Sequence, residues 1–117
     1  MYQTMAITKQ TILTFYERFF NQQRLEAAEA LIAENYRQHN PGVENGREGL
    51  IEAFSKKFAS DEYFHLEVDR IVLDEEYAGV FLRSVDPKGK TKAHVVDLYR
   101  IAENQFVEHW DYFDRGK

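Results

Sequence analysis

Apolar residues recur at three- and four-residue steps through the first half of the chain, which is the spacing of one helix face. A first helix is predicted to begin after Thr8, a suitable N-cap, and to end at Asn21. A second helix is predicted over residues 25–33 and a third after Asn45-Gly46. Between them, residues 36–42 are polar and aromatic, and their Pro-Gly pair predicts a turn.

From residue 64 onward, apolar residues alternate with polar ones, as in a half-buried strand. The alternation slips by one residue near Arg70, which predicts a bulge or bend. A second strand is predicted over residues 77–85, followed by a turn at 86–90. The last two strands form a hairpin about Glu103-Asn104.

Helices followed by antiparallel strands predict an α+β fold, with three N-terminal helices on one face of a strongly bent, mostly antiparallel sheet. Residues 1–117 make one domain on length alone. A bent sheet resembles a cone, and its mouth is a natural small-molecule pocket. The side chains predicted to face the sheet are Phe15, Phe19, Leu31, Leu50 and Phe54.

Asp97 is the most informative residue, because it alternates with apolar and aromatic residues along its strand. A carboxylate on the apolar face of a strand costs several kcal/mol unless it is paired or neutralised. One interpretation is an acid/base catalyst in an apolar pocket. The other is a buried structural carboxylate paired with Arg83 or Arg100 across the sheet.

The hairpin register decides which side chains stand beside Asp97. A two-residue turn at Glu103-Asn104 is favoured and pairs Asp97 with Trp110, so that one face carries Val95, Asp97, Tyr99, Glu108, Trp110 and Tyr112. A three-residue loop would instead bring His109 and Asp111 beside Asp97. Trp110 is equally consistent with a pocket wall and with the core, whereas Glu108 also fits an ordinary solvated strand position.

The net charge and the amino-acid composition limit the kinds of molecule that the protein is expected to bind. The net charge of −5 disfavours nucleic acids and anionic membrane surfaces. The absence of cysteine excludes a disulfide scaffold and a thiolate nucleophile. No basic, apolar leader and no membrane-length apolar run is visible, so a soluble cytoplasmic protein is expected. The four histidines lack the His-x-His or His-x-x-x-His spacing, and no metal is expected.

Four segments together resemble the SnoaL-like family, within the ketosteroid isomerase/NTF2-like fold group. They are residues 36–41 (YRQHNP), 46–50 (GREGL), 95–100 (VVDLYR) and 107–111 (VEHWD), and the resemblance spans roughly residues 8–114. It implies a cone-shaped α+β barrel, usually dimeric, with an apolar pocket. It also implies cofactor-free polyketide cyclase chemistry, an aldol condensation using one Asp as acid/base, and Asp97 is the matching residue.

Two functional hypotheses follow. In the first, the chain is a cofactor-free isomerase, cyclase or aldol catalyst acting on a small apolar or aromatic carbonyl compound. Asp97 and His39 are then the candidate catalytic residues, and the candidate ligand-binding residues are Tyr16, Tyr36, Asn40, Phe54, Tyr99, Glu108, Trp110 and Tyr112. In the second, the same fold is a non-catalytic dimer that binds a ligand or a protein. A homodimer is expected through the open face of the sheet, where Val96, Leu98 and Val107 are apolar.

Overall fold

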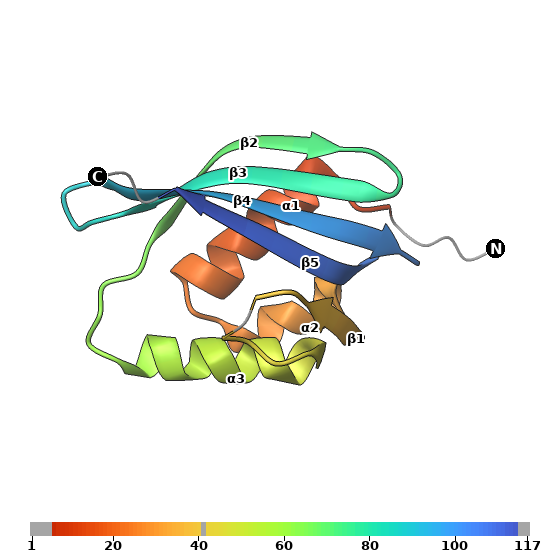
Figure 1. Ribbon diagram of the computed structural model, residues 1–117, viewed down its shortest axis with the longest axis horizontal. Coiled ribbons are helices and arrows are strands. Elements are labelled where there is room, and N and C mark those ends of the chain that lie inside the picture. The colour runs from red at the N-terminus through yellow and green to blue at the C-terminus, as the bar shows by residue number, and fades with distance from the viewer. Residues whose placement is uncertain (1–5, 41, 115–117) are drawn as a thin grey trace.

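The computed structural model describes residues 6–40 and 42–114 of the chain. Three helices and associated turns precede most of a five-stranded sheet, as Figure 1 shows. The helical elements are α1 (Lys9–Phe15), a π-helical segment (Tyr16–Asn21), a 3-10 turn (Leu25–Ala27), α2 (Ala28–Leu31) and α3 (Gly46–Ala59). The strands are β1 (Ile32–Gln38), β2 (Leu66–Leu73), β3 (Tyr77–Val85), β4 (Thr91–Ala102) and β5 (Gln105–Asp114).

The sheet has the order β1-β5-β4-β3-β2. β1 runs parallel to β5, and every other neighbouring pair is antiparallel. In Figure 1, α1 passes behind the long strands, and α3 lies below them, beside β1. The helices therefore stand over one face of the sheet, and the predicted α+β fold is confirmed.

The first helix begins as the sequence predicts. The Thr8 hydroxyl accepts a hydrogen bond from the Thr11 amide at 3.1 Å, and the Thr11 hydroxyl accepts one from the Thr8 amide at 3.1 Å. This reciprocal cap satisfies two amide groups that a helix N-terminus leaves without partners. The π-helical segment then carries the chain to Asn21, where the helix was predicted to end.

β1 is the element that the periodicity did not predict. Its residues were assigned to the end of the second helix and to the polar segment after it, but α2 ends at Leu31. Ile32 and Tyr36 are each 1% exposed, because the strand inserts its apolar side chains beneath α3. Parallel pairing with β5, a contact distant in sequence, overrides the local helical pattern.

The strand half of the chain follows the predicted pattern closely. β3 has the predicted bounds, and the pairing of β2 with β3 shifts by one residue between Val68 and Arg70, at the predicted bulge. The β4–β5 turn is the predicted two-residue one, since Ala102 pairs with Gln105. Glu103 and Asn104 have φ angles of 52° and 61°, as a type I′ turn requires.

The core between helices and sheet is rich in aromatic rings. Phe19 is fully buried and stacks on Phe15 with ring centroids 5.3 Å apart, while its edge-on neighbours include Phe20 and Phe54. Leu31 of α2 and Leu50 of α3 are also buried in this core. Aromatic pairs of this kind add to the free energy that burial of apolar surface supplies. Within the described residues, no helix is long and apolar enough to cross a membrane.

Gly49→Ala is expected to destabilise the fold. A Cβ at position 49 would lie 2.2 Å from the carbonyl oxygen of Glu44, so the backbone before α3 would have to move. Overpacking of this kind costs about 1–3 kcal/mol, which urea denaturation would measure. Gly42→Ala is the matched control, because its nearest neighbour is Asn40 Oδ1 at 3.6 Å. Equal stability of the two variants would contradict the prediction.

Candidate active site

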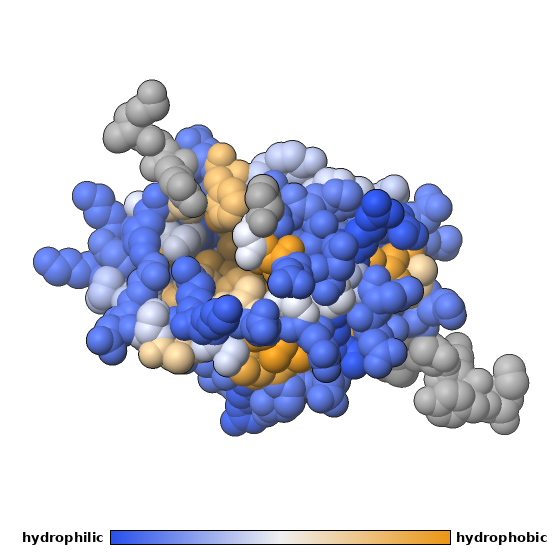
Figure 2. All heavy atoms as spheres, turned by 60° about the horizontal axis from the view of Figure 1, so that its bottom comes forward, coloured by the Kyte–Doolittle hydropathy of each residue, from blue (hydrophilic) through white to orange (hydrophobic). Residues whose placement is uncertain are grey.

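A cavity of about 470 Å³ lies between the helices and the sheet. Its walls are mainly apolar and include Phe15, Phe20, Leu50, Phe54, Leu66 and Val95. Figure 2 shows a hollow in the surface with apolar atoms inside it and hydrophilic residues around it. Asp97 and His109 line the cavity and are 8% and 6% exposed, so its inner end carries polar groups shielded from bulk water.

Asp97 accepts hydrogen bonds on both of its carboxylate oxygens. The Tyr16 hydroxyl donates to Oδ2, and Oδ1 lies 3.0 Å from His109 Nε2. The arginine pairing that the sequence left open is not formed. Arg83 bonds Asp69 at 2.9 Å, and Arg100 bonds Glu108 at 3.0 Å. The carboxylate is thus held by a phenol and an imidazole rather than by the guanidinium of Arg83 or Arg100.

His109 links the carboxylate to the edge strand β1. Gln38 pairs with His109 in the parallel β1–β5 register, and its Oε1 lies 2.7 Å from His109 Nδ1. His109 donates a hydrogen bond to Asp97 when its Nε2 carries a proton. Its Nδ1 donates to the Gln38 side-chain oxygen when Nδ1 is protonated as well. When Nδ1 has no proton, the Gln38 side-chain amide can rotate so that its NH2 group donates to Nδ1. Tyr99 stacks on the imidazole with centroids 4.8 Å apart, which fixes the ring plane.

Two buried tyrosines form a hydrogen-bonded chain that ends at Asp97. The hydroxyls of Tyr99 and Tyr16 are 2.7 Å apart, and Tyr16 gives its own proton to Asp97, so Tyr99 donates to Tyr16. Burial raises the pKa of Tyr16 and of Tyr99 well above the usual value, and the negative charge of Asp97 raises both further. Both phenols therefore stay protonated and act as donors.

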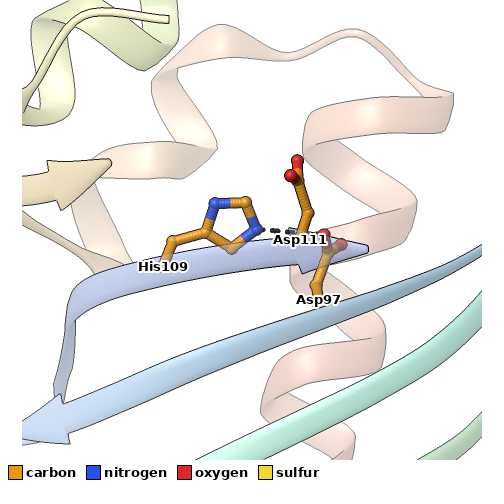
Figure 3. A group of neighbouring side chains, drawn as sticks. All are labelled: Asp97, His109 and Asp111. Carbon is orange, nitrogen blue, oxygen red and sulfur yellow. Dashed lines mark hydrogen bonds and ion pairs between the residues drawn. The ribbon is translucent and has the colours of Figure 1, made fainter. Parts of the chain in front are cut away.

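Asp111 is the second carboxylate of the cavity and stands directly across the sheet from Asp97. Its Oδ2 accepts a hydrogen bond from Asn40 Nδ2 at 2.9 Å. Figure 3 shows Asp97 on β4 and both His109 and Asp111 on β5, with the dashed line joining His109 to Asp97. Like charges directly opposite each other are unfavourable in a sheet, so this pair is a candidate functional feature.

Asp97, His109 and Asp111 also form the group, among the described residues, that could hold a metal ion. Each offers one ligand atom, and these atoms lie within 4.8 Å of one another. A bound cation would replace the existing hydrogen bond between Asp97 Oδ1 and His109 Nε2. In this structure Asp97 and His109 hydrogen-bond to each other, and Asp111 hydrogen-bonds to Asn40.

The predicted site residues divide between the two faces of the sheet. Asp97, Tyr36, Asn40, Phe54 and Tyr99 line the cavity, and Tyr16 contacts Asp97 directly. The structure does not bring the other candidates to this group. Glu108, Trp110 and Tyr112 alternate to the outer face of β5, and His39 lies with them.

The register predicted from the turn is wrong, and a β-bulge is the reason. Ile101 pairs with Phe106 but Arg100 pairs with Glu108, so Val107 is an extra residue in β5. The insertion moves Asp97 from the predicted partner Trp110 to Asp111. A bulge of one residue thus produces the pairing that a three-residue loop would have given.

The displaced candidates form a polar cluster on the outer face. Glu108 accepts hydrogen bonds from His39 at 2.7 Å and from Arg100 at 3.0 Å, and the His39 ring stacks on Trp110 at 4.9 Å. The hydrogen bonds from His39 and Arg100 lower the pKa of Glu108. Their stabilising effect is present at neutral pH and is lost as the pH falls through that lowered pKa.

Sequence reasoning missed Gln38, His109 and Asp111 as cavity residues. The sequence brings His109 and Asp111 beside Asp97 only with a three-residue loop, and it places Gln38 in a polar and aromatic segment that contains a turn. The one available signal was the alternation of His109 and Asp111 with aromatic residues, which fits either face of a strand. The parallel strand β1 and the bulge at Val107 together decide the face.

Comparison with solved structures shows the same fold in proteins of low sequence identity. TsrD from Streptomyces laurentii is 21% identical, with a TM-score of 0.72 over 92% of this chain and 91% of that one. IdmH from Streptomyces antibioticus, provisionally assigned as a polyketide cyclase, is 22% identical, with a TM-score of 0.69 over 90% of each chain. An NTF2-like protein of unknown function from Cytophaga hutchinsonii is 20% identical, with a TM-score of 0.73 over 97% and 95% of the two chains.

A search of curated proteins finds no significant match. The model of the family described as SnoaL-like polyketide cyclase matches residues 10–117, which is nearly the whole chain. The match includes every strand of the sheet and all the side chains that hydrogen-bond around Asp97. The chain therefore belongs to the SnoaL-like polyketide cyclase family.

Proposed function

We propose that this protein catalyses proton transfer at a carbon next to a carbonyl group, without a cofactor, in a reaction of the isomerase, cyclase or aldol type. The substrate is a small, mainly apolar carbonyl compound, and Asp97 is the acid/base. The observation that carries the proposal is a buried carboxylate at the inner end of an apolar cavity, held by Tyr16 and His109, while Arg83 and Arg100 bond other carboxylates.

The hydrogen bonds around Asp97 suit a group that gains and loses a proton. Tyr16 donates a hydrogen bond to one carboxylate oxygen and fixes its position. His109 holds the other oxygen and connects it to Gln38, so the orientation of the carboxyl group is set by two elements of the fold. A positioned acid/base of this kind contributes about 100- to 10,000-fold to a reaction rate.

The developing enolate oxygen needs a hydrogen-bond donor near the same end of the cavity. Asn40 lines the cavity and donates through Nδ2 to Asp111, 2.9 Å away. A substrate oxygen that takes the place of the Asp111 carboxylate would receive the hydrogen bond from Asn40 Nδ2. Donors fixed in advance toward a developing negative charge are an effective source of rate acceleration.

Proton exchange into D2O, followed by NMR, tests this proposal without knowledge of the natural substrate. β-Tetralone is a suitable probe, because it is apolar, uncharged and carries exchangeable protons next to its carbonyl group. The protein is expected to accelerate their exchange above the buffer rate. Binding of β-tetralone with exchange at the buffer rate would reject the catalytic proposal and support the non-catalytic binding module.

We further propose that the protein is a homodimer through the outer face of the sheet. Phe81, Val96 and Tyr112 form one row across three strands, and Leu98 and Trp110 form the next. Phe81 and Tyr112 are 42% and 58% exposed. A contiguous apolar surface of this kind is typical of a protein interface.

Light scattering is expected to give about twice the 13.8 kDa chain mass at micromolar concentration. Val96→Asp should lower the mass to that of one chain, because it places a charge at the centre of the apolar rows. Lys88→Asp in the exposed turn is the control and should leave the mass unchanged. A wild-type particle of 13.8 kDa would contradict the dimer.

A further inference from the structure

The outer end of the cavity carries charged side chains, in contrast to its apolar walls. Lys57, Glu62 and Lys92 all line the cavity. The side chains of Lys57 and Glu62 are 35% and 55% exposed, and Lys92 is also exposed. Because Asp97 and His109 at the other end are buried, the cavity runs from a charged, open mouth to a buried polar end.

Lys92 reaches the mouth because of a second β-bulge. Ser84 pairs with Ala93, but the next residue, Val85, pairs with Thr91, so Lys92 is the extra residue of β4. In a regular strand, Lys92 and Ala93 would point to opposite faces, yet both line the cavity. Bulges often re-aim a side chain beside a functional site, and this one directs an ammonium group to the cavity.

Lys57 approaches the same mouth from the last turn of α3. Its ammonium group lies 3.7 Å from Glu62 and 5.2 Å from the centre of the Phe64 ring. An exposed ion pair of this length contributes little to stability. A ligand anion can therefore take the place of Glu62 beside Lys57 without a large loss of folding free energy.

The buried end of the cavity repels anions. Asp97 and Asp111 stand opposite each other there, and their described partners are Tyr16, His109 and Asn40. Two carboxylates in a poorly hydrated site disfavour a third negative group by direct Coulomb repulsion. A ligand with one anionic end is thus oriented, with its neutral carbonyl end inward and its charge at the mouth.

We propose that the substrate is an amphipathic anion: an apolar body with a carbonyl group at one end and a carboxylate, or a similar anion, at the other. Lys57 and Lys92 bind the anion, and the carbonyl group reaches Asp97. The rows of Asp97 and Ala93 are about 13 Å apart along β4, and the lysine side chains can reach inward, so this spacing is an upper limit on the span between the two groups. This inference rests on the proposed function of the cavity and adds the class of its substrate.

A matched pair of fluorescent ligands tests the proposal by binding alone. 6-Acetyl-2-naphthoate carries a carbonyl group and a carboxylate on opposite ends of an apolar ring system, and its methyl ester lacks only the charge. The acid is expected to bind the wild-type protein at least about 10-fold more tightly than the ester, since hydrogen bonds to a charged group are stronger than neutral ones. This preference should shrink as the salt concentration rises.

Single substitutions separate the mouth from the rest of the cavity. Lys92→Gln and Lys57→Gln are each expected to weaken binding of the acid about fivefold and to leave binding of the ester unchanged. Glu62→Gln should strengthen binding of the acid, because it removes both a negative charge and the competitor for Lys57. Lys90→Gln and Lys56→Gln are the controls, since these lysines do not line the cavity.

Equal affinity of the acid and the ester for the wild-type protein would overturn the proposal, as would full affinity for the acid in the Lys57→Gln/Lys92→Gln double variant. The outcome is independent of catalysis, because β-tetralone is uncharged and its exchange does not involve the mouth. Selective binding of the acid, together with β-tetralone that binds but does not exchange, would support the anion site and reject the acid/base role. β-Tetralone exchange without selective binding of the acid would support the acid/base role and reject the anion site.

Discussion

Asp97→Asn is expected to slow β-tetralone proton exchange about 100- to 10,000-fold, which is the contribution of a well-placed general base. The substitution keeps the shape of the side chain but removes the group that accepts the proton. The protein should still bind the ligand, since the cavity walls are unchanged. Exchange rates from NMR and ligand affinity from fluorescence would distinguish loss of catalysis from loss of binding.

The same substitution is expected to change the free energy of unfolding by no more than about 1–2 kcal/mol. The asparagine oxygen can accept the proton of Tyr16, and its amide group can donate to a neutral His109 ring. Neither Arg83 nor Arg100 loses a partner, because each bonds another carboxylate. A much larger loss would indicate that Asp97 is chiefly structural.

Two control variants identify the group that takes the proton. Asp69→Asn should retain full exchange activity, since Asp69 is exposed and pairs with Arg83 outside the cavity. Asp111→Asn removes the other carboxylate of the cavity and keeps a hydrogen-bonding side chain of similar size at that position. If Asp111→Asn abolishes exchange while Asp97→Asn does not, the assignment of Asp97 as the base is wrong.

Phe19→Ala is expected to reduce the free energy of unfolding by about 3–5 kcal/mol. The ring is fully buried and stacks on or meets the edges of neighbouring Phe rings, so its removal leaves a void that the helices and sheet cannot readily fill. A domain of this size has a total stability of about 5–15 kcal/mol, so the loss is a large fraction of it.

Urea denaturation followed by circular dichroism measures this effect. Leu13→Ala is the control on the same helix, because Leu13 is 40% exposed and its truncation should cost less than about 1 kcal/mol. A similar loss in both variants would show that helix propensity, rather than aromatic packing, determines the result. A loss below about 1 kcal/mol for Phe19→Ala would contradict the role of the aromatic core.

Local sequence patterns predict most of the elements of this fold. The helix face around Phe15 and Phe19, the slip near Arg70 and the two-residue turn at Glu103-Asn104 are each encoded within a few residues. Such signals depend on side-chain periodicity and turn chemistry, which the chain carries locally. They sufficed for the fold class and for placing Asp97 on the apolar face of its strand.

Local sequence patterns could not predict which side chains line the cavity. Which face His109 and Asp111 occupy depends on the bulge at Val107, and the contact of Gln38 with His109 depends on β1 joining the sheet edge. Both are decided by pairing between distant segments rather than by local preference. His39 and Trp110 were for this reason predicted beside Asp97, whereas they stack on each other on the outer face.

The bulge at Val107 makes the set of side chains that line the cavity depend on one unpaired residue. If Val107 were an ordinary ladder residue opposite Arg100, every side chain after it would turn to the other face. Glu108 and Trp110 would then enter the cavity in place of His109 and Asp111. Forming or losing one bulge in such a hairpin offers a lineage two alternative sets of cavity side chains on one scaffold, with no change in its helices or turns.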